Sequence, residues 1–239
     1  MLPVILTIGS FKLYSFGVFF AIALFAGLYW WWKLGRDEHL EETALFDTFF
    51  LGALTFFVVG RLGYVLLHLA DFANIYRILG FLAFPGISFL AGGVGVTLLI
   101  VGLAYYQEWE VWKVLDNMVT SLGVVLVIGG IGGILNGTLG MAPDIVQLVW
   151  AVIYFAVVAN VRKNFRFYSW YRNDRTVAPE GLPSLVAAML VGVLYLVRGF
   201  IESTWKIGPV SYYTLGGVVV VLLSSVIIYL RSDRHLFKK

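Results

Sequence analysis

Long runs of apolar residues, separated by short polar stretches, make up most of the chain. Seven of these runs approach or exceed the roughly 20 residues that a helix needs to cross the hydrocarbon core of a bilayer. They cover residues 14–32, 45–67, 78–106, 114–139, 145–161, 185–201 and 212–230. They lack the regular alternation of apolar and polar residues that a transmembrane β-barrel requires. The pattern therefore predicts an all-α, polytopic integral membrane protein with seven transmembrane helices.

The third run is the longest and carries Pro85 followed by Gly86. Proline removes a backbone donor and clashes with the preceding turn of a helix. We therefore expect the third span to begin as a kinked or re-entrant piece. The sixth run follows Pro183 and Ser184, which together are typical of a helix start.

The composition supports a membrane protein. Of the 239 residues, 60% are hydrophobic and 13% are charged, and the mean hydropathy is +0.89. Soluble domains are far less apolar, so a soluble protein is excluded. Since no internal repeat or low-complexity segment interrupts the chain, we expect a single transmembrane domain over residues 1–239.

Lysine and arginine are distributed unequally between the two sides of the predicted spans. One side holds Lys33, Arg36, Lys113, Arg162, Lys163, Arg166, Arg172, Arg175, Arg231, Arg234, Lys238 and Lys239. The other side holds Lys12, Arg77 and Lys206. Cytoplasmic loops keep the positive charge. This asymmetry predicts an amino terminus outside the cell and a carboxyl terminus in the cytoplasm.

The residue types give no support to metal, thiol or nucleic-acid chemistry. The chain has no cysteine, and His39, His68 and His235 lack the spacing of metal ligands. We therefore expect no metal and no cofactor. The net charge of +3 is explained by topology and by contact with the lipid surface, so we expect no nucleic-acid partner.

Ionisable side chains inside spans are costly, at about 2.5–3.5 kcal/mol each at a helix centre on insertion scales. Asp47 and Asp116 stand near cytoplasmic span starts, where we expect carboxylates to cap helix amino termini. Arg198 and Glu202 are four residues apart and share one helix face. Two interpretations stay open for this pair: a structural ion pair, or an arginine that Glu202 holds toward a lipid phosphate.

Arg61 lies about two thirds of the way through the second run, toward the outer leaflet. Its guanidinium either extends to the interface or reaches the same cavity as Arg198. Two cations on the outer side of the membrane suit an anionic lipid headgroup better than a cytoplasmic phosphate.

The segment GGIGGILNG, residues 129–137, places five glycines in nine positions. Small residues let a neighbouring helix or a ligand approach the backbone closely. Two interpretations follow: tight helix packing, or a lipid-accessible cavity in which Asn136 is a polar contact. The segment LAGGVG, residues 90–95, repeats the pattern in the third run.

Six stretches together resemble the prolipoprotein diacylglyceryl transferase family, in order and over nearly the whole chain. They are LYSFGVFF (13–20, similar to a YSYG-like segment), VVGRLGYVL (58–66, to GARLGYVL), PGISFLAGGVG (85–95, to GGLSFHGG), GGIGGILNGTLG (129–140, to GRIGNFINGE), QLVW (147–150, to QLYE) and VRGFIE (197–202, to FRFIVE). Asp116 precedes the fourth stretch by the same distance as an aspartate of the family signature.

The resemblance implies a multi-pass enzyme of the bacterial cytoplasmic (inner) membrane. It also implies the reaction, transfer of a diacylglyceryl group from phosphatidylglycerol to the lipobox cysteine of a prolipoprotein, with release of glycerol phosphate. The implied partners are phosphatidylglycerol or another anionic phospholipid and the signal peptide of a prolipoprotein.

The resemblance carries over to six residues. It implies Arg198 and Glu202 as catalytic residues, and it implies lipid binding by Arg61, Gly132, Asn136, Gly137 and Arg198.

Five family positions hold other residues here. The family tyrosine falls on Phe16, its histidine on Leu90, its signature arginine on Gly130, its signature asparagine on Gly133, and its glutamate on Thr138. Two hypotheses follow. In the first, the chain is a divergent transferase in which another group, such as the tyrosine at 64, 212 or 213, takes the thiol proton. In the second, it is a noncatalytic homologue that binds lipid or lipoprotein.

Overall fold

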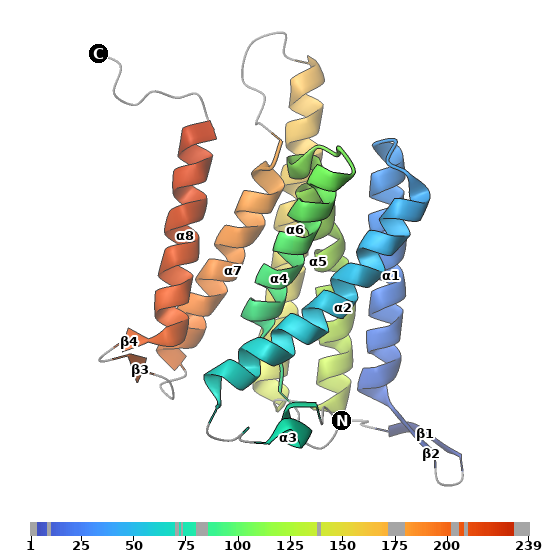
Figure 1. Ribbon diagram of the computed structural model, residues 1–239, viewed down its shortest axis with the longest axis vertical. Helices are drawn as coiled ribbons and strands as arrows, with labels where there is room; N and C mark the ends of the chain where they lie inside the picture. The colour runs from blue at the N-terminus through green and yellow to red at the C-terminus, as the bar shows by residue number, and fades with distance from the viewer. Residues whose placement is uncertain are drawn as a thin grey trace. The chain divides into compact units, whose positions relative to one another are not determined.

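The computed structural model describes residues 4–8, 11–69, 72, 74–79, 86–137, 140–171, 180–201, 206–207 and 210–231. Seven helices in these ranges are long and apolar enough to cross a membrane, as the sequence predicts. They are α1 (Ser15–Asp37), α2 (Glu42–Leu67), α4 (Phe89–Tyr106), α5 (Val111–Asn136), α6 (Met141–Tyr171), α7 (Leu182–Ile201) and α8 (Tyr212–Arg231) (Figure 1). The chain is a multi-pass membrane protein.

The third apolar run, residues 78–106, was expected to begin as a kinked or re-entrant piece at Pro85 and Gly86. The spanning helix α4 begins after this pair, at Phe89, and a short helix, α3, covers Ile75–Leu79. Residues 80–85 lie outside the described residues, so the re-entrant piece itself stays a prediction. Ser88 is the N-cap residue of α4, since its hydroxyl accepts a hydrogen bond from the Ala91 N–H at 3.3 Å. This bond satisfies a donor that the first helical turn would leave without a partner.

Two short antiparallel sheets lie outside the seven spans and were not predicted. The first pairs β1 (Val4–Ile8) with β2 (Phe11–Tyr14), and the second pairs β3 (Lys206–Ile207) with β4 (Val210–Ser211). Strands of two to five residues leave no clear alternation in a sequence. A search for membrane-crossing elements therefore passes over them.

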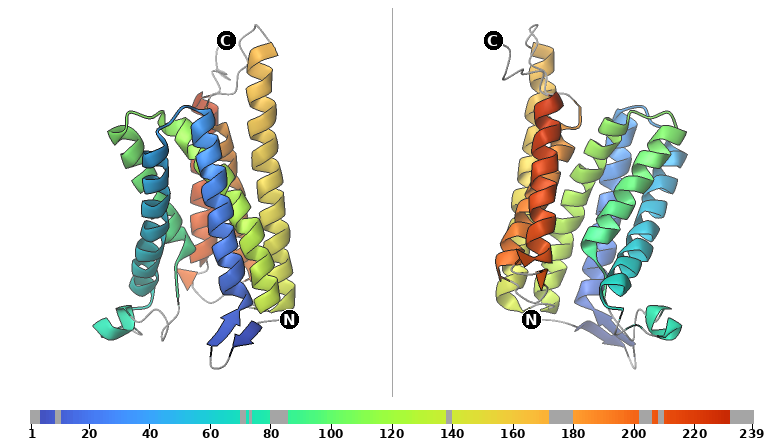
Figure 2. Two further views of the ribbon diagram at one scale, coloured as in Figure 1. Left: turned by 90° about the vertical axis from the view of Figure 1, so that its right-hand side faces the viewer. Right: turned by 60° about the vertical axis from the view of Figure 1, so that its left-hand side comes forward.

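The chain divides into two compact units, which we describe separately. Unit 1 contains Met1–Trp30 and Asp116–Lys239, and unit 2 contains Trp31–Leu115. The single domain expected over residues 1–239 stays a prediction. In unit 2, α4 lies along α2, and in unit 1, α8 lies along α7 (Figures 1 and 2).

Glycines make the α7–α8 contact close. A Cβ on Gly217 would lie 2.7 Å from the carbonyl oxygen of Gly192 and 2.8 Å from the backbone nitrogen of Leu196. Contacts this short leave no room for any side chain. The two helix backbones therefore touch directly, which is a common way to pack helices in lipid.

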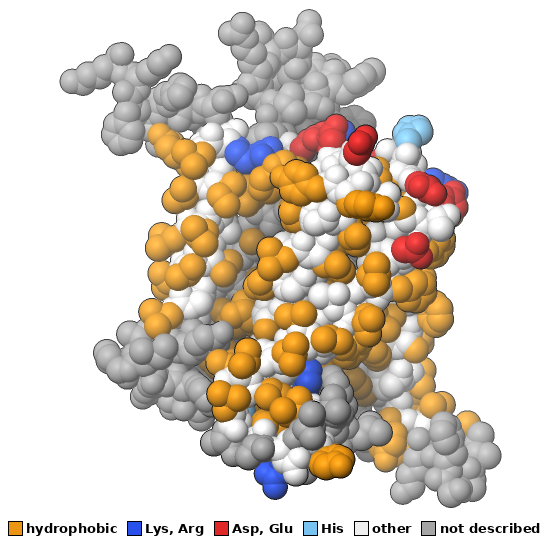
Figure 3. Space-filling view, in the orientation of Figure 1, with side chains coloured by type: hydrophobic (Ala, Val, Ile, Leu, Met, Phe, Trp, Pro, Cys, Tyr) orange, Lys and Arg blue, Asp and Glu red, His pale blue; other side chains and the backbone are white. Residues whose placement is uncertain are grey.

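Large apolar side chains cover the outside of the helices, as lipid requires. Exposed examples from three different spans are Phe25, Leu98 and Leu222. On the face drawn in Figure 3, orange side chains cover the middle of the helices, and charged side chains gather near helix ends.

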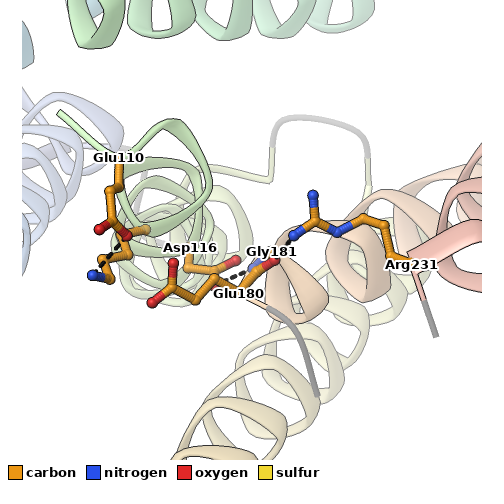
Figure 4. Close-up of polar contacts among 6 residues, drawn as sticks. Glu110, Asp116, Glu180, Gly181 and Arg231 are labelled. Atoms are coloured by element: carbon orange, nitrogen blue, oxygen red, sulfur yellow. Dashed lines mark hydrogen bonds and ion pairs between the residues drawn. The ribbon is translucent and has the colours of Figure 1, made fainter. Parts of the chain in front are cut away.

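Asp116 caps a helix, as predicted, but not its own. It lies in the second turn of α5, and its carboxylate accepts hydrogen bonds from the Gly181 N–H at 2.9 Å and the Ser184 N–H at 3.0 Å. The Ser184 hydroxyl donates a further bond at 2.5 Å. These donors belong to the start of α7, so Asp116 ties α7 to α5 (Figure 4). Asp47 is exposed in the second turn of α2.

Arg162 is buried near Asp116, although its position in the sequence placed it among the cytoplasmic charges. Its guanidinium donates to the Asn117 side-chain oxygen at 2.6 Å and to the Thr120 hydroxyl at 3.3 Å. These bonds join α6 to α5. At the same end of unit 1, the Arg231 guanidinium donates to the carbonyl of Glu180 at 2.8 Å (Figure 4).

Candidate functional site

Three of the predicted site residues, Asn136, Gly137 and Arg198, lie at the same end of unit 1. The carboxyl ends of α5 and α7 and the amino ends of α6 and α8 lie at the same, lower end in Figure 1. Asn136 is the last residue of α5, and Arg198 lies in the last turn of α7. The end of unit 1 that holds Asn136 and Arg198 is therefore opposite to the end that holds Asp116.

Arg198 is exposed at this end and lies over an aromatic ring. Its guanidinium carbon is 5.2 Å from the ring centre of Tyr213, in the first turn of α8. Tyr213 in turn packs against Tyr195, with ring centres 5.8 Å apart. The Tyr213 ring attracts the cation and limits where its side chain extends. Close packing of Gly199 on Thr214 fixes the two helix ends beside each other.

Glu202 lies outside the described residues, and so does Thr138. The predicted pairing of Glu202 with Arg198, and the catalytic role of both, therefore stay predictions.

Gly137 ends α5 by its backbone conformation. It has φ +67°, in the left-handed region that favours glycine, and its N–H donates to the Gly133 carbonyl at 2.8 Å. The preceding Asn136 is half-buried. The Asn-Gly pair therefore terminates α5, and this structural role accounts for it. Lipid binding by these two residues stays a prediction.

The glycine-rich part of α5 is mostly used for close packing. A Cβ on Gly132 would lie 2.6 Å from the Cβ of Phe19 in α1, and a Cβ on Gly130 would lie 3.1 Å from Cδ1 of Leu148 in α6. Only Gly129 in this segment has no neighbour within 4 Å of such a Cβ among the described residues. Of the two interpretations, tight packing therefore holds for Gly130 and Gly132.

Asp144 is a buried carboxylate at this end of unit 1 and was not among the predicted site residues. It lies in the first turn of α6 and is 3% exposed. A Cβ on Gly133 would be 3.8 Å from its Oδ1 atom, which is an ordinary contact distance. The predicted fifth span begins at residue 145 and therefore leaves Asp144 out. The Pro-Asp pair before that run was the available signal, because acidic residues favour the first turn of a helix.

Arg61, in unit 2, is fully occupied with the backbone of its own unit. It is 2% exposed, and its guanidinium donates to the carbonyls of Arg77 at 2.7 Å, Ile78 at 3.0 Å and Gly86 at 3.0 Å. It also lies 4.9 Å from the ring centre of Phe72. Arg61 therefore does not extend to solvent. Its contact with lipid stays a prediction.

The sequence Gly-Arg-Leu-Gly-Tyr around Arg61, residues 60–64, lies at the contact between α2 and the start of α4. The Ser88 N–H donates to the Gly60 carbonyl at 2.9 Å, and Gly63 packs closely on Ala91. One turn after Gly60, Tyr64 stacks on His68 with ring centres 4.2 Å apart. The Gly-Arg-Leu-Gly-Tyr sequence is thus explained by packing within unit 2.

Comparison with known proteins identifies the family that the sequence motifs resemble. The family model described as prolipoprotein diacylglyceryl transferase matches residues 3–232. The phosphatidylglycerol–prolipoprotein diacylglyceryl transferase of Methylobacillus flagellatus is 29% identical over 223 residues, or 88% of this chain and 80% of that protein. The enzyme of the same name from Shewanella sp. (strain ANA-3) is 26% identical over an alignment of 250 residues, which covers 94% of this chain and 82% of that protein.

A third relative of the same name, from Fusobacterium nucleatum, is 27% identical over 177 residues, or 72% of this chain and 56% of that protein. The chain belongs to the prolipoprotein diacylglyceryl transferase family. The resemblance read from its sequence motifs is confirmed.

Proposed function

We propose that this protein transfers a diacylglyceryl group from phosphatidylglycerol to the cysteine of a prolipoprotein. The observation that carries the proposal is the family match over residues 3–232. We place the protein in the bacterial cytoplasmic membrane, with its amino terminus outside and its carboxyl terminus in the cytoplasm. Its partners are then phosphatidylglycerol and the signal peptide of a prolipoprotein.

The reaction sets two requirements for the site. The cysteine sulfur attacks the glyceryl carbon that carries the phosphate, so that a C–S bond forms and the C–O bond to phosphate breaks. Glycerol phosphate leaves with the bonding electron pair, and the thiol proton passes to a base. The site therefore needs a cation on the phosphate side and a proton acceptor on the thiol side.

Arg198 is the cation that best fits the phosphate side. An arginine binds phosphate through paired hydrogen bonds and stabilises the charge of the leaving group. Arg198 is exposed, and Tyr213 supports its guanidinium. Glu202 orients Arg198 in this proposal, and Asn136 and Gly137 contact the lipid. Gly132 packs on Phe19, so its part is to hold α5 close to α1.

Arg61 has a smaller part in lipid binding. It is 2% exposed, and its guanidinium donates to three backbone carbonyls of unit 2. We therefore expect its contribution to lipid affinity to come from its positive charge, and to be weaker than that of Arg198.

The test is thioether formation in phosphatidylglycerol liposomes with a lipobox peptide, monitored by the mass of the diacylglyceryl adduct. We expect the wild type to form the adduct, and Arg198→Ala to slow it by about 10²–10³-fold, as for the loss of a charge-stabilising donor. Arg231→Ala is the matched control, because Arg231 lies in the last turn of α8, at the opposite end of unit 1.

The Methylobacillus flagellatus relative serves as the positive control in the same liposomes. If that relative forms adduct and the wild type does not, the proposed transfer is wrong. Phosphatidylglycerol that stays bound through purification would then identify a noncatalytic lipid-binding homologue.

A further inference from the structure

Tyr213, in the first turn of α8, contacts two side chains that α7 presents on one face. Its ring centre lies 5.2 Å from the guanidinium carbon of Arg198 and 5.8 Å from the ring centre of Tyr195. Tyr195 and Arg198 are three residues apart, so they are neighbours on the surface of α7. Tyr213 is half-buried, whereas Arg198 is exposed. The ring of Tyr213 is therefore a fixed surface over which an exposed cation lies.

Backbone contacts hold these two helix ends in one register. A Cβ on Gly199 would lie 2.6 Å from the backbone nitrogen of Thr214, the residue after Tyr213. About one turn away, a Cβ on Gly217 would lie 2.8 Å from the backbone nitrogen of Leu196. Contacts this short admit no side chain between the helices. The register of α7 and α8 therefore fixes where the Tyr213 ring lies relative to the backbone of Arg198.

An aromatic ring holds an arginine in a way that suits phosphate binding. It attracts the guanidinium through its face, so this contact uses none of the five N–H donors of the arginine. It also adds no negative charge that would repel a phosphate. Arg61 shows the opposite arrangement, since its guanidinium donates to three backbone carbonyls. The Tyr213 ring thus restricts the orientation of Arg198 without competing with a phosphate for hydrogen bonds.

We propose that Tyr213 is a positioning residue, whose ring orients Arg198 toward the phosphate of phosphatidylglycerol; this rests on the proposed transferase function. The sequence left Tyr213 open as an acceptor of the thiol proton. Its place beneath the cation assigned to the phosphate side favours the positioning role instead. The ring is then the part of Tyr213 that matters, and its hydroxyl is dispensable.

The experiment compares Tyr213→Leu and Tyr213→Phe with wild type in two measurements. The first is the affinity of the full-length protein in detergent for short-chain phosphatidylglycerol, with phosphatidylcholine as the comparison lipid. The second is the rate of adduct formation in the liposome assay. We expect Tyr213→Leu to weaken phosphatidylglycerol binding and to slow the adduct by about threefold to tenfold each. Phosphatidylcholine binding should not change. Tyr213→Phe keeps the ring and should stay within about twofold of wild type in both measurements.

A double-mutant cycle with Arg198 separates positioning from a structural role. In an Arg198→Ala background, Tyr213→Leu should cause no further loss of phosphatidylglycerol affinity or of rate, because the side chain that the ring orients is gone. A role in stability alone would persist in that background. Tyr229→Leu is the matched control, since Tyr229 lies near the other end of α8. It should leave lipid affinity and rate at the wild-type values.

Three results would overturn the role of Tyr213. One is a Tyr213→Leu variant with wild-type affinity for phosphatidylglycerol. Another is a Tyr213→Phe variant that loses as much rate as Tyr213→Leu, which would assign the function to the hydroxyl. The third is an equal effect of Tyr213→Leu with and without Arg198. A wild type that forms no adduct beside the active relative overturns the transferase function alone, and the phosphatidylglycerol affinities then still decide whether Tyr213 positions Arg198.

Discussion

Arg61 and Arg198 carry the same charge but use it differently. Arg61 is 2% exposed and binds three backbone carbonyls, whereas Arg198 is exposed and lies over Tyr213. The sequence identified both arginines by residue type and position in their spans. It could not separate their roles, because the carbonyls around Arg61 come from residues 16 to 25 positions further along the chain.

We expect Arg61→Lys and Arg61→Met to loosen the start of α4 to a similar extent. A lysine cannot reach three carbonyls at once, and each hydrogen bond to a charged group contributes about 1.5–3 kcal/mol. Hydrogen exchange of the amides of residues 86–92 should therefore accelerate about tenfold or more in both variants. Exchange that stays at the wild-type rate in Arg61→Lys would show that charge alone matters. Arg198→Lys, in unit 1, is the control and should leave these amides unchanged.

Two features of buried aspartates could not be predicted from the sequence. The burial of Asp144 was not predicted, because the predicted fifth span starts one residue after it. Asp116 was expected to cap a helix, but the N–H groups that it accepts hydrogen bonds from belong to Gly181 and Ser184, which lie 65 and 68 residues further along the chain. A local pattern predicts that a carboxylate caps a helix. It does not predict which distant helix that is.

At the scale of elements, length and hydrophobicity predicted all seven spanning helices. The predicted third span starts at residue 78, and α4 starts 11 residues later, at Phe89. Pro85 and Gly86 indicated an irregular start of this span, but hydrophobicity alone does not show that the helix begins only after the N-cap residue Ser88. For the glycine segments the sequence left close packing and a cavity open, and the structure shows close packing at Gly130 and Gly132.

Adjacent glycines in α8 provide a direct test of close packing. A Cβ on Gly217 would lie 2.7 Å from the Gly192 carbonyl oxygen, while a Cβ on Gly216 would meet no described atom within 4 Å. Gly217→Ala should therefore cost about 1–3 kcal/mol in the free energy of unfolding, as overpacked cores do. Gly216→Ala should be neutral or slightly stabilising, because alanine favours helix. Thermal unfolding in detergent measures both, and equal melting temperatures would contradict the contact.

At the scale of the whole molecule, the distribution of Lys and Arg predicts the orientation in the membrane. The chain has no cysteine, so single cysteines can be introduced without background. The variants Asn74→Cys and Glu41→Cys each introduce one thiol at an exposed position. Glu41 directly precedes α2 and Asn74 follows it, so the predicted topology puts the two thiols on opposite sides of the membrane.

We expect a membrane-impermeant maleimide to label Asn74→Cys in intact cells and Glu41→Cys only after permeabilisation. Labelling of both variants under the same denaturing conditions controls for their expression. The reverse labelling pattern would show that the topology is opposite to the prediction, with Arg198 and Asp144 on the cytoplasmic side.

We propose that this family member carries out the transfer with a different set of side chains. One sample of wild-type protein with phosphatidylglycerol and a lipobox peptide tests this, when the diacylglyceryl adduct and free glycerol phosphate are followed together. We expect both products to appear at the same rate and in equal amounts. Phosphatidylglycerol that remains bound, with neither product formed beside an active relative, would contradict it.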